Sequence, residues 1–331
     1  MSILELIKRT IPFFISRFVV YLIFGLISIV FLGLMLGLGI LLFRWFDFAS
    51  GFFIILMIIT FFSVLAILRF IERYFLYMVK VGHISVVTEL LRNGKVPEGK
   101  SQISYGKDQV VNHFGSANVA FVVDKIIFAA VKQIQRWLMR IGNFFSFVPG
   151  AKNIMAILSK VMGVSLRYID EAILSYIMLR KSNAKESGAD EEESVWKNAC
   201  DGVVLYAQSW KKIVMTAAGI VVFVYILNIT VFLVTVFPLM ALSSMITDNA
   251  GAAGILGYFA IIGAFIFASM VKRALVDPIA MIAMVRTFQL NTQDMEPSID
   301  LQQKILKVSS KFKELFKKKD DDLQKVSEPN N

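Results

Sequence analysis

The most regular feature of the chain is the spacing of its apolar runs. Four stretches carry no charged side chain and approach or exceed the roughly 20 apolar residues that cross the hydrocarbon of a bilayer. They are residues 18–43, 51–68, 213–246 and 252–271. Short polar links join the first pair and the last pair, so the members of each pair must run antiparallel. The pattern predicts an all-α integral membrane protein with four transmembrane helices arranged as two hairpins.

Between the two hairpins, the apolar positions follow a helical repeat with charges on the other face. Residues 107–141 and 152–180 both place apolar side chains at three- and four-residue spacing. In the first of these helices, Asp124, Gln135 and Arg136 lie away from the apolar stripe. Charges at central positions exclude both helices from the membrane interior. They can lie in the headgroup plane, pack on each other, or form an interface between protomers.

Changes of composition divide the chain into five segments. The first hairpin and a charged helical extension occupy 1–92, and the amphipathic segment occupies 93–182, beginning with a Gly- and Pro-containing loop at 93–106. An acidic linker at 183–194 precedes the second hairpin and its extension, at 195–290. The last segment, 291–331, predicts a lysine-rich amphipathic helix that frays into disorder, either solvated or in contact with anionic lipid.

Details within the apolar runs predict local geometry. Gly33 and Gly37 form a small-xxx-small pair, which permits close helix packing, although helices in lipid also tolerate glycine without it. Pro238 lies inside the third run and is expected to kink that helix or end its regular part. Both hairpins share a basic lead-in, two spans and a charged extension, which indicates either an internal duplication or a coincidence of hydropathy.

Composition and charge indicate the kind of membrane surface that the chain contacts and its orientation. It has 331 residues, of which 56% are hydrophobic, and a mean hydropathy of +0.66. The net charge is +10, and its Lys and Arg residues flank the apolar runs, so anionic lipid headgroups are a better partner than nucleic acid. The two short links hold one basic residue, Arg44, which predicts cytoplasmic termini and a cytoplasmic middle segment. We expect the plasma membrane of a bacterium or an archaeon.

Charged residues beside the apolar runs are the candidate functional residues. After the second and fourth spans, a basic residue is followed three or four positions later by an acid, which allows pairing on one helix face. Ionisable groups at this depth either pair structurally or line a pathway. Pro278 breaks the helix beside a carboxylate, as in transporter ion sites. The candidates are Arg69, Glu72, Arg73, Arg167, Asp170, Glu171, Arg273 and Asp277, with Pro278 as the helix break.

The sequence contains no enzyme signature. It lacks a Gly-rich phosphate loop, a nucleophile elbow and an HExxH motif. One cysteine, Cys200, and two histidines, His83 and His113, can form neither a disulfide within the chain nor a Cys/His metal cluster. We interpret the histidines as surface or packing residues and Cys200 as a buried small side chain, and we expect no cofactor.

Three segments in the second half of the chain occur in a recognisable order. Residues 166–177 read LRYIDEAILSYI, residues 199–213 lead into an apolar run, and residues 267–277 read FASMVKRALVD. In this order they resemble the C-terminal half of the choline transporter-like family, with Asp170 and Glu171 in place of the family's polar motif. The chain has fewer spans than that family. The resemblance implies movement of a small organic cation or similar solute.

Two functions from different classes follow from these observations. The first is a transporter or pore for ions or small cationic solutes, with paired charges at the inner membrane edge shaping selectivity. Four transmembrane helices are too few to enclose a pathway within one protomer, so this function requires a homo-oligomer. The alternative is a non-catalytic membrane scaffold or subunit, which organises lipid or partner proteins through its amphipathic helices.

Overall fold

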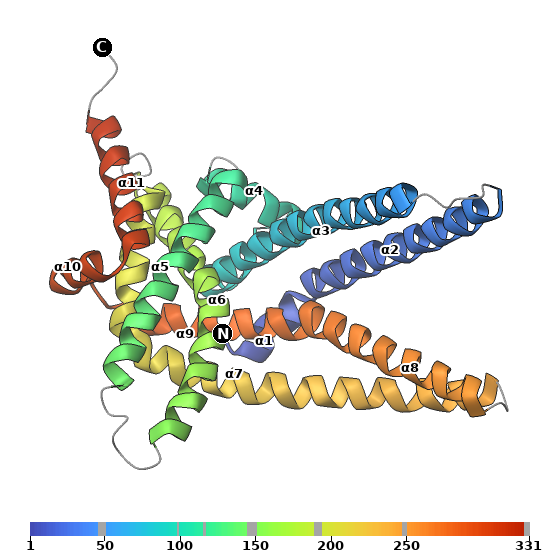
Figure 1. The fold of residues 1–331 in the computed structure, drawn as a ribbon. Helices are drawn as coiled ribbons and strands as arrows, with labels where there is room; N and C mark the ends of the chain where they lie inside the picture. The colour runs from blue at the N-terminus through green and yellow to red at the C-terminus, as the bar shows by residue number, and fades with distance from the viewer. Residues whose placement is uncertain are drawn as a thin grey trace.

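The fold of the described residues is helical throughout. The computed structural model describes residues 1–45, 51–97, 99–114, 117–143, 151–188, 194–246 and 250–327, and these contain no strand. Long helical segments project to one side of a helical body that contains the remaining helices (Figure 1). The prediction of an all-α protein is confirmed.

The N-terminal third of the chain forms a short helix followed by two long ones. Ser2 caps the first turn by accepting a hydrogen bond from the Glu5 backbone N–H at 3.2 Å. The two long helices contact each other through Phe24 and Phe75, whose ring centroids are 6.2 Å apart, and through Phe31 and Phe61 at 6.0 Å. These contacts require antiparallel directions. The elements are α1 (Ile3–Arg9), α2 (Ile11–Trp45) and α3 (Gly51–Asn93).

The third apolar run belongs to the longest helix of the chain. This helix, α7 (Val195–Ile246), joins the basic lead-in and the apolar run without interruption over 52 residues. It continues through Pro238, so the proline does not end it. A fourth long helix, α8 (Ala250–Val271), lies beside it (Figure 1). A π-helix, η2 (Lys272–Val276), and α9 (Asp277–Thr292) continue from α8 into the body.

Among the described residues, three helical stretches are long and apolar enough to cross a membrane. They are Ile11–Met35, Val195–Leu242 and Leu256–Thr292. Their apolar side chains largely face outward, as at Val30 and Phe265. The predicted span at 51–68 lies in α3, but several of its first side chains are outside those that the structure describes.

The predicted close-packing glycines do not bring helices of this chain together. A Cβ added at Gly33 or Gly37 would meet no heavy atom within 4 Å. The close approach occurs instead in the body, where a Cβ at Gly106 would lie 2.6 Å from the Gly82 carbonyl oxygen. Only glycine therefore permits α4 (Gln102–Phe114) to pack this closely on α3, a contact that the spacing of small residues did not indicate.

The middle segment forms three helices that pack into the core of the body. The predicted helix at 107–141 is instead two helices, the first of which starts earlier and shortens the predicted loop. The predicted packing of these helices on each other is observed, with Ile127 and Ile173 fully buried. A position in the headgroup plane or at a protomer interface stays a prediction. The helices of the middle segment are α4 (Gln102–Phe114), α5 (Ala117–Asn143) and α6 (Ala151–Glu186).

Two polar residues of α5 that lie off its apolar stripe are buried. Asp124 is 1% exposed and Gln135 is 5% exposed, because α5 is covered by α7 and α6 on more than one face. The Gln135 side-chain amide donates a hydrogen bond to the Tyr206 hydroxyl of α7 at 2.7 Å. A periodicity argument that assumes one covered face fails for a helix inside a body.

The charged tail also belongs to the body. It forms α10 (Ile299–Val308) and α11 (Ser310–Ser327), which contact α5 and α7. Phe312 and Leu315 of α11 are fully buried in the core. These residues therefore do not form a free tail, since one face of the lysine-rich helix is apolar and covered. Contact of its lysines with anionic lipid stays a prediction. The acidic run at 190–193 lies outside the described residues.

Candidate functional site

Four elements meet where the long helices leave the body. The first turns of α2 bring Arg17 and Tyr21 to this junction, and the middle of α3 brings the residues from 69 to 80. The second half of α6 supplies the segment 167–171, and η2 supplies Arg273. Residues from distant parts of the sequence are thereby collected at one level of the molecule.

The π-helix determines how Asp277 is held. The Asp277 backbone N–H donates to the Lys272 carbonyl five residues earlier, which is the defining bond of a π-turn. This register brings the Lys272 Nζ to 2.8 Å from the Asp277 carboxylate, and the Tyr168 hydroxyl donates to the same oxygen at 2.8 Å. The predicted pairing of Arg273 with Asp277 is not formed, because the wider turn places Lys272 in that position.

Two neighbouring cavities open at this junction. Their volumes are about 290 Å³ and about 300 Å³. Both include Tyr21, Arg73, Arg273 and Asp277 in their walls, so they are two parts of one membrane-edge cavity. The complete lining is Arg17, Tyr21, Arg69, Glu72, Arg73, Leu76, Tyr77, Lys80, Arg167, Tyr168, Glu171, Arg273 and Asp277.

The lining of the membrane-edge cavity is predominantly basic. Its acidic side chains are Glu72, Glu171 and Asp277, and basic side chains outnumber them two to one. The pairing predicted between Arg69 and Glu72 does not form an ion pair in the described structure, so these two charges remain available at the cavity wall. A cavity with this balance attracts anions.

Arg17 is the least expected member of this lining. Its side chain is 93% buried, with an exposed fraction of 7%, and it lies in the cavity wall. The Nε and Nη2 groups have no hydrogen-bond partner among the described residues. Glu171 and Asp277 attract the guanidinium through space without bonding to those two nitrogens. Unsatisfied donors on a buried charge are costly, so this position fits an anionic ligand.

Lys80 lies in the cavity wall, at the centre of a second set of charges that extends behind the wall. Its ammonium lies 3.5 Å from the carboxylate of Asp124 and 3.5 Å from that of Glu171. Burial by itself lowers the pKa of Lys80, but the carboxylates of Asp124, Glu171 and Asp170 outweigh that effect and raise the pKa. Lys80 is therefore charged at neutral pH.

The two adjacent acids of α6, Asp170 and Glu171, differ from ordinary surface carboxylates. Burial raises the pKa of Glu171 to about 7, although Lys80 and Arg17 oppose the shift. Burial also raises the pKa of Asp170 well above its ordinary value, because the attraction of Lys80 does not offset it. Glu171 can therefore hold or release a proton near neutral pH, at the cavity wall.

His83 lies beside this cluster as a packing residue. Its ring stacks on Phe13 at a centroid distance of 4.8 Å and meets the edge of Phe14 at 5.5 Å. Burial and the nearby Arg17 lower the pKa of His83 well below its ordinary value, so the ring is neutral. This agrees with the packing alternative for His83. The side chain of His113 lies outside those described, and Cys200 is buried as predicted.

The junction brings together most of the predicted residues. Asp170 lies behind the wall near Lys80, and Pro278 is buried in the first turn of α9. Sequence reasoning missed Arg17 and Lys80 as site residues because both were counted only as flanking charges. Their positions within apolar helical stretches were the available signal. Seven candidates line the cavity: Arg69, Glu72, Arg73, Arg167, Glu171, Arg273 and Asp277.

Comparisons and metal chemistry add no further assignment. Comparison of the chain with protein-family models, with curated proteins and with solved structures finds no match. Within the described part of the chain, no group of three His, Cys, Asp or Glu side chains is placed to hold a metal ion.

Proposed function

We propose that this chain is a multi-pass membrane protein with four spans arranged as two hairpins. The α2–α3 and α7–α8 pairs would cross the bilayer, and the helical body would lie on the cytoplasmic side. Support comes from the outward-facing apolar side chains of the long helices and from the Lys and Arg residues that flank them. The membrane-edge cavity would then lie at the level of the cytoplasmic headgroups.

We infer that the protein binds an anionic lipid headgroup in this cavity and organises lipid around its helices without catalysis. The observation that carries this function is Arg17, a buried guanidinium with two unpartnered N–H groups in a basic cavity wall. A guanidinium binds phosphate through two parallel hydrogen bonds. The charge balance also argues against the small cationic solute implied by the family resemblance.

The depth of the site favours a lipid as the source of the anion. Arg17 belongs to a stretch that is apolar enough to span, and exposed apolar side chains of α2, from Val19 onward, lie directly beyond it. A lipid can therefore place its chains along α2 while its phosphate reaches the cavity. Basic pockets between helices on the cytoplasmic side are a known form of headgroup site.

Substitution of Arg17 tests this function. In detergent, phosphatidylglycerol should raise the melting temperature of the wild type more than phosphatidylcholine does. Arg17→Gln should weaken the response to phosphatidylglycerol at least tenfold in lipid concentration, because a hydrogen bond to a charged group contributes about 1.5–3 kcal/mol. Arg17→Lys should keep part of the response, since it keeps the charge and loses the two-pronged geometry.

The readout is the difference between lipid-bound and lipid-free melting temperatures, which a purely structural role for Arg17 would leave unchanged. Arg9→Gln, at an exposed arginine paired with Glu5, is the control. Equal responses of wild type and Arg17→Gln to phosphatidylglycerol would contradict the proposed headgroup site.

Solute transport through a homo-oligomer is the second candidate function. The helix interrupted by η2 beside Asp277, next to acids with raised pKa values, is the arrangement that favours it. Asp277→Asn or Glu72→Gln should then change solute flux in liposomes while assembly persists. The open faces of Gly33 and Gly37 leave room for a second copy, so the mass of the protein in nanodiscs tests oligomerisation.

A further inference from the structure

A second cavity lies between α5 and the junction of α10 with α11. The helices α10 and α11 lie on the side of the body away from the long apolar helices (Figure 1). The volume of the cavity is about 560 Å³, which is in the range of small-molecule sites. None of the described residues that line it is acidic. The lining is Gln133, Arg136, Trp137, Arg140, Lys307, Val308, Ser310 and Lys313.

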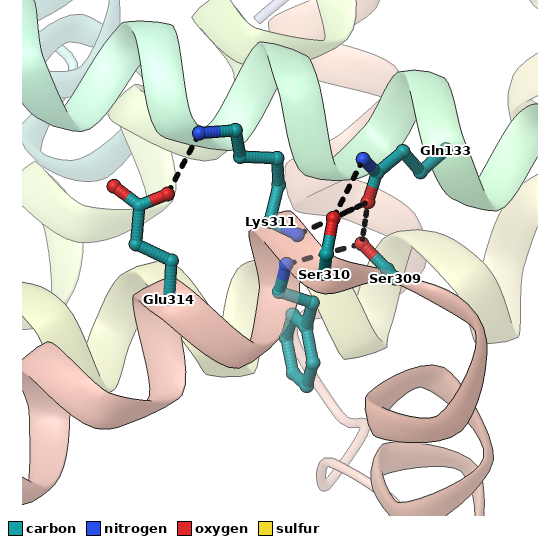
Figure 2. A network of polar contacts seen from close by, with 6 residues as sticks. Gln133, Ser309, Ser310, Lys311 and Glu314 are labelled. Atoms are coloured by element: carbon teal, nitrogen blue, oxygen red, sulfur yellow. Dashed lines mark hydrogen bonds and ion pairs between the residues drawn. The ribbon is translucent and has the colours of Figure 1, made fainter.

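This second cavity is called the basic cleft. Its positive charge is not balanced by nearby carboxylates. Within the described residues, the four basic side chains of the lining form no ion pair. Glu314, on the first turns of α11, is instead held by the Lys311 ammonium at 2.8 Å (Figure 2). Arg136 and Arg140 stand one helical turn apart, a spacing at which like charges repel.

The walls of the cleft are fixed by a network centred on Gln133 (Figure 2). The Gln133 side-chain oxygen accepts hydrogen bonds from the Ser309 hydroxyl at 2.7 Å and from the Lys311 backbone N–H at 3.0 Å. The Gln133 amide nitrogen donates to the Ser310 hydroxyl at 3.1 Å. These bonds, with Phe312 buried in the core, attach the start of α11 to α5.

The same network defines which groups remain for a ligand. The backbone N–H groups of Lys311 and Phe312 already donate to Gln133 and to the Ser309 hydroxyl. The backbone N–H groups at the N-terminus of α11 are therefore already bonded within the protein. A ligand would have to be bound by the basic side chains. Arginine forks and lysine ammonium groups are the usual partners of phosphate.

We propose that this cleft binds a soluble organic polyphosphate, a molecule of nucleotide size with two or more phosphate groups. Arg136, Arg140, Lys307 and Lys313 would hold the phosphates, and the half-buried Trp137 would contact the organic part. The shared chemistry is a cluster of phosphate charges, which a lipid headgroup could also supply. The position of the cleft away from the long apolar helices favours the soluble source.

Binding to the full chain in detergent, at one fixed salt concentration, tests the proposal. The probes are ATP, inorganic triphosphate and vesicles of phosphatidylglycerol, with calorimetry or thermal shift as the readout. We expect both soluble probes to bind, and the double variant Arg136→Gln with Lys313→Gln to weaken their affinity at least tenfold. Trp137→Ala should lower the affinity for ATP and leave that for triphosphate unchanged.

A matched double variant distinguishes specific binding in the cleft from non-specific electrostatic attraction of anions to the protein surface. Lys132→Gln with Lys317→Gln removes two exposed charges from the same two helices, outside the cleft. It should change the affinity less than twofold. Equal losses in the two double variants, no binding of either soluble probe, or vesicle binding that alone depends on Arg136 and Lys313 would each overturn the proposal.

Discussion

Lys80 and the acids around it set the electrostatic character of one wall of the membrane-edge cavity. One buried ammonium faces Asp124 and Glu171 at 3.5 Å each, and Asp170 also contributes to its field. One positive charge does not offset the burial of all these carboxylates, so the pKa values of Asp170 and Glu171 are raised. A group with a pKa near neutrality changes charge under ordinary conditions, which makes its effect measurable.

Glu171 predicts a pH dependence of stability at the residue scale. Its pKa rises from 4.5 to about 7 on folding, mainly through burial. Its contribution to stability is therefore fully present below about pH 4.5 and is lost as the pH rises through about 7. Between pH 5 and pH 8, the free energy of unfolding of the wild type should fall relative to that of Glu171→Gln by on the order of 1–3 kcal/mol.

Chemical or thermal unfolding in detergent across this pH range measures the difference. Glu5→Gln, at an exposed acid of α1, controls for the loss of a carboxylate. If the wild type and Glu171→Gln kept a constant difference from pH 5 to pH 8, Glu171 would not titrate in the folded protein in this range.

At the scale of elements, the π-helix and the C-terminal helices have the largest effects on the two sites. The extra residue in the π-turn rotates the start of α9 and brings Lys272, Tyr168 and Asp277 together. The pair α10–α11 closes the body against α5 and α7 and forms one wall of the basic cleft. Neither effect is visible from the local sequence, since both depend on what the element packs against.

Phe312 predicts the contribution of α11 to the fold. Its side chain is fully buried, so Phe312→Ala should lower the free energy of unfolding by about 3–5 kcal/mol. Limited proteolysis should then remove the residues of α10 and α11 before the rest of the chain. Lys317→Ala, at an exposed position of the same helix, should leave both measurements unchanged. A melting temperature for Phe312→Ala equal to that of the wild type would place α11 outside the core.

At the scale of the whole molecule, the arrangement of the helices fits a membrane protein with a body on one side. The projecting parts of the long helices expose apolar side chains, whereas the body has a contiguous apolar core that includes Ile84, Ile173 and Phe288. Both candidate cavities lie at the body, one where the long helices leave it and one on its opposite side. Bound anions would therefore approach the first from the bilayer and the second from water.

Accessible cysteines test the proposed orientation. Ser50→Cys and Asn249→Cys lie in the short links, outside the described residues, and Ser187→Cys lies at the exposed end of α6. An impermeant maleimide should label the first two on intact cells and the third only after permeabilisation. The native Cys200 is buried and should give little background. Labelling of positions 50 and 249 from opposite sides of the membrane would exclude two hairpins.

The sequence predicted the class of the elements and most of the residues at the membrane-edge cavity. Long uncharged runs permit few alternatives to helices, because every backbone polar group in lipid must bond within its own segment. Charges at the ends of such runs are restricted to the edge of the membrane, so Arg73, Glu72 and Asp277 could be selected without a structure. Their common depth explains why the structure finds them around one cavity.

The ion-pair partners of the charged side chains, and the burial of polar side chains, could not be predicted in the same way. Asp124 lies off the apolar stripe of α5 but becomes buried because several helices cover α5. Asp277 pairs with Lys272 rather than Arg273, because a π-turn changes the register by one residue. The sequence by itself determined where helices form and which charges lie at their ends. Tertiary packing decided which charges are buried, paired or left without a partner, because these properties depend on neighbours that are distant along the chain.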